Sequence, residues 1–137
     1  MDAGWTCIPS IIIERQRAFG LDAIDINILM HLAAHWWTED NKPYPSKVTI
    51  ATALDVTPRT VQRRIAAMED AGFVRREERR IRGKGSNTNR YHLDGLINAA
   101  RPYAQEKLEK RAERDEERKK SVARKGKPRL RVVKSDK

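Results

Sequence analysis

Apolar residues at spacings of three and four predict two amphipathic helices in the first half of the chain. In residues 22–37 this stripe consists of Ile24, Ile28, Leu29, Leu32, Ala33 and Trp36. Such spacing places the apolar side chains on one face of a helix, which would pack against a core. A second stripe, made of Val61, Ile65 and Met68, predicts a helix over residues 58–71. Its ends are marked, because Thr57 can cap it, Pro58 suits its first position and Gly72 can adopt the left-handed conformation after it.

Capping and turn residues predict two shorter helices. Ser46 can cap a helix that ends at Leu54, before a turn at Asp55 and Val56. Near the N-terminus, Pro9 and Ser10 indicate the start of a short helix, with Ser10 as its cap, that ends at Gly20. The segment 38–45 contains two prolines and is expected to be a connector.

The pattern changes after Gly72. Residues 73–80 and 89–93 are expected to form two antiparallel strands around a glycine-rich loop at 81–88. From Leu96 to Lys120 the sequence is again typical of a helix, which we expect Pro102 to interrupt. The sequence therefore predicts a mainly α protein with a small β-hairpin. It is organised as a domain over residues 1–95, a charged helix over 96–120 and a basic flexible tail over 121–137.

The charge of the chain indicates an anionic partner. The 137 residues include 29 Lys and Arg against 19 Asp and Glu, a net charge of +10, which suits a protein that binds nucleic acid or an acidic membrane surface. Residues 1–45 carry −3, since they hold three basic and six acidic side chains, whereas residues 46–94 hold eleven basic and six acidic ones and carry +5. The positive charge thus begins with the helix 46–54.

The sequence argues against a membrane span and against secretion. No apolar run approaches the roughly 18 residues that a membrane span requires, and the segment after Met1 is acidic. The single cysteine, Cys7, allows no internal disulfide, which fits a reducing compartment. We therefore expect a soluble, cytoplasmic protein without a membrane anchor.

The order of elements in residues 46–93 resembles the winged helix-turn-helix domains of bacterial and phage regulators. The resemblance rests on Ala51 at the helix contact, Val56 in the turn and the segment 60–65 in the second helix. Many relatives have glycine in the turn where this chain has Asp55, but Asp tolerates the left-handed conformation better than most residues. The segment 5–9 and the helix 22–37 are also similar to the N-terminal domains of phage and plasmid replication initiators. The resemblance implies that the protein binds duplex DNA, and no cofactor is expected.

Helix geometry indicates which side chains of the second helix can meet DNA bases. At about 100° per residue, Arg59 and Arg63 point nearly opposite Val61, with Thr60 and Gln62 beside them. An α-helix fits the major groove, where Arg can pair with guanine and Gln with adenine. We therefore expect four base-reading residues, which are Arg59, Thr60, Gln62 and Arg63. The alternative interpretation is a solvated charged face.

Two further sets of residues are expected to contact DNA. The first set would hold the phosphate backbone and consists of Ser46, Lys47, Thr57 and Arg64. Arg64 belongs to it because it turns toward the edge of the core. The second set lies in the wing, where glycines allow a close approach to a phosphate or a narrow groove, and consists of Arg82, Lys84, Asn87 and Arg90. The alternative for the wing is a mobile hairpin that its charge keeps soluble.

Other patterns carry no functional prediction. His31 and His35 have metal-ligand spacing, but Cys7 and His92 would have to converge with them, so we predict no metal site. We interpret Trp36 and Trp37 as a core or dimer contact rather than as a surface on which bases stack. No phosphate-binding loop, nucleophile elbow or pair of catalytic carboxylates is present, so we expect no enzymatic activity.

Three functional hypotheses follow. The first is a sequence-specific transcription regulator that acts on double-stranded DNA. The second is a phage or plasmid replication initiator, which would recruit replication proteins through its charged C-terminal part. The third is an architectural protein that coats DNA with little regard for sequence. Homodimer formation is a further hypothesis, because two half-sites would be read by two copies.

Overall fold

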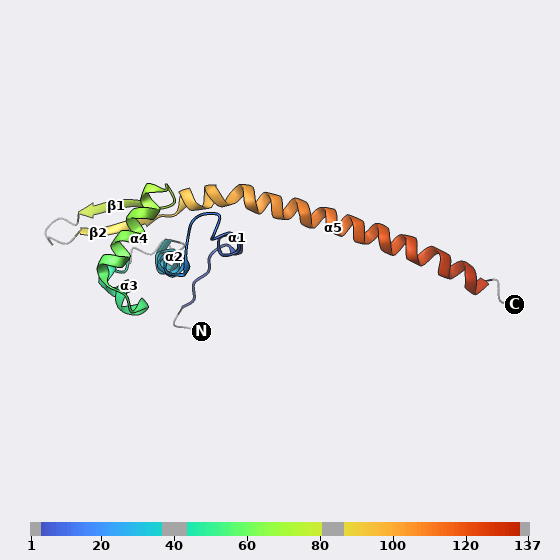
Figure 1. Ribbon diagram of the computed structural model, residues 1–137, viewed down its shortest axis with the longest axis horizontal. Helices are drawn as coiled ribbons and strands as arrows, with labels where there is room; N and C mark the ends of the chain where they lie inside the picture. Colours follow the sequence, from blue (N-terminus) through green and yellow to red (C-terminus); the bar gives the residue numbers. More distant parts are fainter. Residues whose placement is uncertain (1–3, 37–43, 81–86, 135–137) are drawn as a thin grey trace. The chain divides into compact units, whose positions relative to one another are not determined.

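The computed structural model describes residues 4–36, 44–80 and 87–134, of which 79, 80, 87–89 and 126–134 are described by their backbone alone. The elements follow in the order α1 (Ser10–Glu14), α2 (Ala23–Trp36), α3 (Lys47–Leu54), α4 (Pro58–Asp70), β1 (Arg75–Arg80), β2 (Asn87–His92) and α5 (Asp94–Lys134) (Figure 1). This confirms the prediction of a mainly α protein with one hairpin. The chain divides into two units, residues 1–101 and 102–137.

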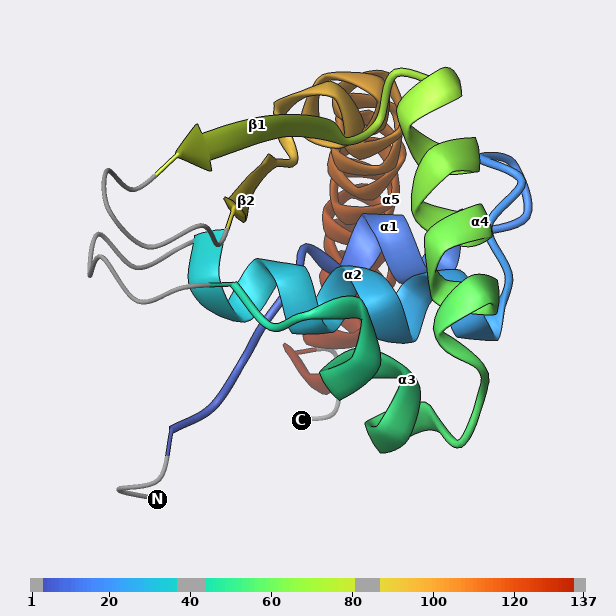
Figure 2. The same ribbon diagram turned by 90° about the vertical axis from the view of Figure 1, so that its left-hand side faces the viewer.

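Helix α2 is the centre of the core of the first unit. It contacts α3, α4 and β2, and Figure 2 shows it running crosswise beside α4 and below the hairpin. Its predicted stripe is buried at Ile28, Leu29, Leu32 and Ala33, while Ile24 and Trp36 are half-buried. Each fully buried Leu or Ile side chain contributes about 1.5–3 kcal/mol, so this stripe is a major source of stability.

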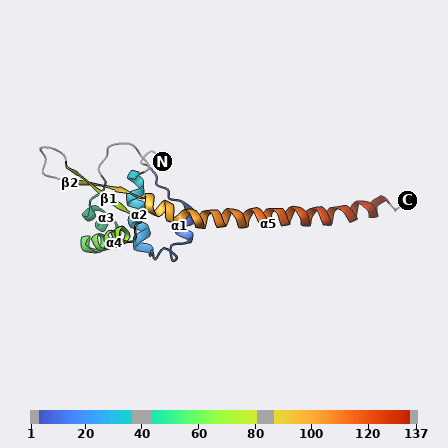
Figure 3. The ribbon, with the colours of Figure 1, turned by 90° about the horizontal axis from the view of Figure 1, so that it is seen from above.

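The two strands form an antiparallel ribbon directly after α4. Arg75 lies opposite His92 and Arg76 opposite Tyr91, and Figure 3 shows the strands side by side, leading away from the start of α5. Tyr91 is buried, its backbone carbonyl accepts a hydrogen bond from the Tyr44 hydroxyl at 3.0 Å, and the two rings meet edge to face at 5.7 Å. The base of the ribbon is thereby attached to the core.

The N-terminal helix is shorter than predicted. Helix α1 ends at Glu14, and Pro9 rather than Ser10 occupies its capping position, with no side-chain cap. Proline has no N–H to satisfy and suits the residue that leads into a helix. The predicted end at Gly20 instead closes a separate turn, in which the Leu21 amide donates to the Gln16 carbonyl at 2.8 Å.

The C-terminal helix is longer than predicted. Helix α5 passes through Pro102, where we expected an interruption, and continues to Lys134, so residues 121–134 have helical backbone where we expected a tail without regular structure. A proline costs a helix one hydrogen bond and a steric clash, but residues rich in Ala, Glu, Lys and Arg favour the helix on both sides. Burial of Leu96 and Ala100 also stabilises the first turns of α5.

Two glycines from distant positions allow the start of α5 to approach the end of α4. A Cβ on Gly95 would overlap the backbone carbonyl of Gly72, and the Leu96 amide donates to the carbonyl of Phe73 at 3.1 Å beside this contact. Gly72 has a φ of +79°, as predicted for the residue after α4. The junction thus excludes any side chain at position 95.

We expect Gly95→Ala to destabilise the protein by about 1–3 kcal/mol, because backbone must move to accommodate the methyl group. Denaturant unfolding measures this change. Asn98→Ala is the control, since Asn98 is exposed on the same helix and alanine there should be neutral or slightly stabilising. A Gly95→Ala protein that unfolds at the same or higher denaturant concentration would contradict the close approach.

Candidate nucleic-acid interface

Helix α3 and the turn after it are held by hydrogen bonds that the sequence predicted. The Ser46 hydroxyl accepts from the Thr49 amide at 3.1 Å and caps α3. At the other end, Asp55 has the left-handed conformation, with φ 55° and ψ 46°. The Val56 amide then donates to the Ala51 carbonyl at 3.0 Å, which closes the end of the helix as in a Schellman motif. Asp55 therefore performs the role that glycine has in many turns of this kind.

Helix α4 has one buried face and one exposed face. The Thr57 hydroxyl accepts from the Thr60 amide at 3.2 Å and caps the helix, with Pro58 at its first position. Val61, Ile65 and Met68 are each at most 2% exposed, which confirms the predicted stripe. At the end of the helix, the Phe73 amide donates to the Met68 carbonyl at 3.0 Å. Both ends of α4 are therefore fixed, and its rotation is set by the core.

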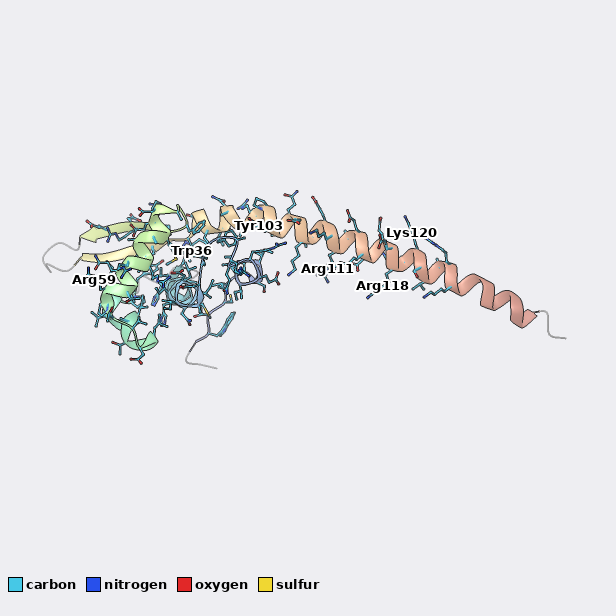
Figure 4. The ribbon with its side chains drawn as sticks, in the orientation of Figure 1. Trp36, Arg59, Tyr103, Arg111, Arg118 and Lys120 are labelled. Carbon is cyan, nitrogen blue, oxygen red and sulfur yellow. The ribbon has the colours of Figure 1, made fainter. Side chains whose placement is uncertain are left out.

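The expected base-reading residues lie together on the exposed face of α4. Arg59, Gln62 and Arg63 are exposed, and Figure 4 shows Arg59 near the start of the helix, at the outer edge of the domain. Thr60 is half-buried, and its hydroxyl lies 2.9 Å from that of Thr57. Three of the four side chains can thus extend from the surface, while Thr60 is also part of the helix cap. Their contact with bases stays a prediction.

A shallow groove follows this face, and no motif in the sequence indicated it directly. Its volume is about 640 Å³, and its lining consists of Thr60, Arg63, Arg64, Ala66, Ala67 and Asp70. Ala66 and Ala67 are exposed, so no long side chain fills the surface behind Arg63. The alanines resemble ordinary helix formers in the sequence, and only the rotation of α4 places them along the groove.

Arg64 lies at the edge of the core, as expected, and forms ion pairs there that we did not predict. Its Nη1 lies 2.6 Å from Oδ2 of Asp22 and 3.6 Å from Oδ2 of Asp25. The guanidinium therefore joins α4 to the N-terminus of α2. This pairing gives Arg64 a structural role, and its contact with phosphate stays a prediction.

The two carboxylates also cap α2 reciprocally. The Asp25 amide donates to Oδ1 of Asp22, and the Asp22 amide donates to Oδ2 of Asp25, each at 3.0 Å. The amide of Asp25 and the charge of Arg64 lower the pKa of Asp22. Burial raises the pKa of Asp25, which is 5% exposed. The spacing of the two acids at the start of a helix is a capping signal that the sequence contained, but nothing local indicated Arg64.

The remaining backbone-contact residues lie at helix starts. Ser46 and Thr57 are exposed and Lys47 is half-buried, at the N-termini of α3 and α4. Helix N-termini favour anions because their first amides point outward. Each hydroxyl accepts an amide hydrogen and retains its own proton as a donor. Their contact with phosphate stays a prediction.

The wing can be compared with prediction only in part. Arg82 and Lys84 lie outside the residues that the structure describes, and Asn87 begins β2 with its side chain outside them as well. Arg90 is half-buried opposite Glu77. The side chain of Glu77 is within hydrogen-bond distance of His92, whose Nε2 lies 2.8 Å from Oε2 of the glutamate. Arg90 and this pair therefore share the face of the ribbon opposite Tyr91.

The other patterns in the sequence also have defined positions. His31 and His35 are half-buried on α2, and the ring of His35 lies 5.4 Å from that of Tyr44. Within the described ranges, no three His, Cys, Asp or Glu side chains are grouped in a way that could hold a metal ion. Trp36 is half-buried, and Trp37 lies outside the described residues. In the same ranges, no helix is both long and apolar enough to span a membrane.

We expect Asp22→Asn to lower stability at neutral pH by less than about 1 kcal/mol, because Asn still caps α2 while the exposed ion pair to Arg64 is lost. The pKa of Asp22 is lowered in the folded protein, so its charge stabilises the fold above the unfolded-state pKa. That contribution is lost as the pH falls below about 4. Denaturant unfolding at several pH values measures the difference between the two proteins. Asp70→Asn is the control, and a pH-independent difference for Asp22→Asn would contradict the ion pair.

Comparison with known proteins agrees with this geometry. Residues 20–74 match a family model described as a helix-turn-helix domain, a span that contains α2, α3 and α4. A search of curated proteins finds no match to the chain. Residues 20–74 are therefore similar to a helix-turn-helix domain, and with the hairpin β1–β2 that follows they have the order of elements of a winged helix-turn-helix.

Proposed function

We propose that this protein binds double-stranded DNA sequence-specifically through α4 and regulates transcription by occupying its site, without catalysing a reaction. The observation that carries the proposal is the exposed face of α4, where Arg59, Gln62 and Arg63 project opposite the buried stripe. These are side-chain types that pair with guanine and adenine in the major groove. Within the described residues, Arg59 and Arg63 form no ion pair that would have to break on binding.

The way α4 is held supports base reading over loose attraction to phosphates. Specific recognition requires that side chains reach base edges in a fixed orientation, whereas phosphate attraction tolerates many orientations. The cap at Thr57 and the Schellman motif at Gly72 fix the two ends of α4. The pairing of Arg64 with Asp22 adds a lateral contact to α2. Such a helix presents its outer side chains with little freedom to reorient.

Phosphate contacts from the helix starts and the wing complete the proposal. Ser46, Lys47 and Thr57 would position α3 and α4 on the duplex. The wing residues Arg82, Lys84, Asn87 and Arg90 would approach the neighbouring groove. Such contacts supply affinity and register, while the base contacts of α4 supply the sequence preference.

Replacing Arg63 with Ala should weaken binding to the preferred site by about 1–3 kcal/mol and relax the preference at one base pair. Binding to random-sequence DNA should weaken less. Fluorescence anisotropy on both DNAs measures the two losses. Arg17→Ala is the control for charge, because Arg17 is exposed in the turn after α1. Equal losses on both DNAs would show that Arg63 contacts phosphate instead of a base.

The biological role is tested by the position of the binding sites. Sites selected from random DNA can be mapped on the source genome. A regulator should occupy sites next to promoters, whereas an origin-binding protein should have repeated sites within a replication origin. An architectural protein would not show the roughly thousandfold or greater preference for one site over random DNA that a specific reader has.

A further inference from the structure

The charges of α5 are sorted onto different faces of the helix in the second unit. At about 100° per residue, five basic side chains point within roughly 40° of one direction, and we call them the basic stripe, which consists of Lys107, Arg111, Arg114, Arg118 and Lys125. All five are exposed. Figure 4 shows Arg111 and Arg118 on one side of α5 and Lys120 on the other. The arrangement is a property of the helical structure, because basic and acidic residues alternate irregularly in the sequence.

The acidic residues of this helix point in other directions than the basic stripe. The same construction places the nearest carboxylates, Asp115 and Glu117, roughly 80° to either side. Glu106, Glu109, Glu113 and Glu116 group on the far side, where Glu106 is paired with Lys110 at 2.8 Å. Within residues 107–125, the face that carries the stripe therefore contains no carboxylate of its own.

We propose that the basic stripe of α5 is a second DNA-binding surface, which contacts the phosphate backbone of duplex DNA without reading its sequence. The stripe extends from residue 107 to residue 125, which is 18 residue steps or roughly 27 Å at 1.5 Å per step. Duplex DNA is a suitable partner because it carries about one charge per 1.7 Å of its axis. The proposal rests on DNA binding by α4 and assigns α5 a separate contribution to it.

Two properties of the stripe favour duplex DNA over other anionic partners. Protein interfaces have apolar cores, whereas the stripe consists of charged side chains, and the further residues nearest to the same face are Ser121 and a single apolar residue, Val122. Single-stranded nucleic acid is usually bound through aromatic side chains that stack on bases, and residues 107–125 contain no aromatic residue. A contact that depends on charge alone fits the phosphates of a duplex.

The test compares two variants of the full chain that lose the same charge from different faces. The stripe variant is Arg111→Gln with Arg118→Gln, and the control variant is Lys120→Gln with Arg124→Gln, whose side chains lie on the far side of α5. Glutamine is a good helix former, so both variants should keep the helix, which circular dichroism checks. The probe is a random-sequence duplex of about three helical turns, titrated at several salt concentrations.

Affinity for DNA decreases as the salt concentration rises, so the slope of log affinity against log salt concentration is negative. We expect this slope to become less steep by about 1.8 in the stripe variant, at about 0.9 per lost phosphate contact. The control variant should change the slope much less. An equal change in both variants would show that only net charge matters and would overturn the proposal, as would an unchanged slope in the stripe variant. Loss of self-association in the stripe variant, measured by sedimentation without DNA and accompanied by an unchanged slope, would assign the stripe to a second copy of the chain.

The outcome is distinguishable from that of the proposed function. The stripe variant should retain the preference for the selected site over random DNA, because the base contacts of α4 are intact. If no DNA sequence is preferred but the two variants still differ in salt slope, the proposal for α5 stands and base reading by α4 fails. If the preference is clear and the slopes are equal, base reading stands and the proposal for α5 fails.

Discussion

The burial of Val61, Ile65 and Met68 against the core decides what α4 can do. An α-helix that commits one stripe to the interior has no choice about which side chains it turns outward. Here the outward side chains are Arg59, Gln62 and Arg63, so the packing of the stripe and the exposure of these side chains are two results of one rotation. The core helix α2, which contacts both α3 and α4, is the platform that makes this rotation definite.

A polar contact reinforces the apolar one. Arg64 lies between the buried stripe and the exposed face, and its pairing with Asp22 and Asp25 connects the side of α4 to the cap of α2. The ion pair to Asp22 is partly exposed and adds little to the stability of the whole protein. Its position matters more, because it adds a contact between α4 and the start of α2 at the edge of the buried stripe. Of the three arginines of α4, Arg64 thus forms ion pairs within the domain, whereas Arg59 and Arg63 are exposed.

Much of the domain could be predicted from sequence because its signals are local. The caps at Ser46 and Thr57, the left-handed residues Asp55 and Gly72 and the stripe of α4 each depend on neighbours within a few residues, and the structure confirms all of them. The role of Arg64 could not be predicted, since its partner Asp22 is 42 positions away. The continuity of α5 was not predicted either, because Pro102 is a strong local signal against a helix. In the structure, the helix-forming residues on both sides of Pro102 outweigh that signal. The candidate base-reading face followed from periodicity, but the groove beside Arg63 depends on the exposed alanines and required the structure.

The contact between Gly72 and Gly95 has a consequence for how such a domain can vary. The two glycines lie just outside the two ends of the hairpin, one before β1 and one after β2, and they fix the distance between the points at which the chain enters and leaves the ribbon. Insertions or deletions at the tip of the hairpin leave that distance unchanged. The contact between the two glycines therefore sets no limit on the length and charge of the tip. A larger residue at position 95 would instead require the backbone at the end of α4 to move. Because the overlap would be with the backbone carbonyl of residue 72, no side chain at that position can relieve it, and position 95 should stay glycine among homologues.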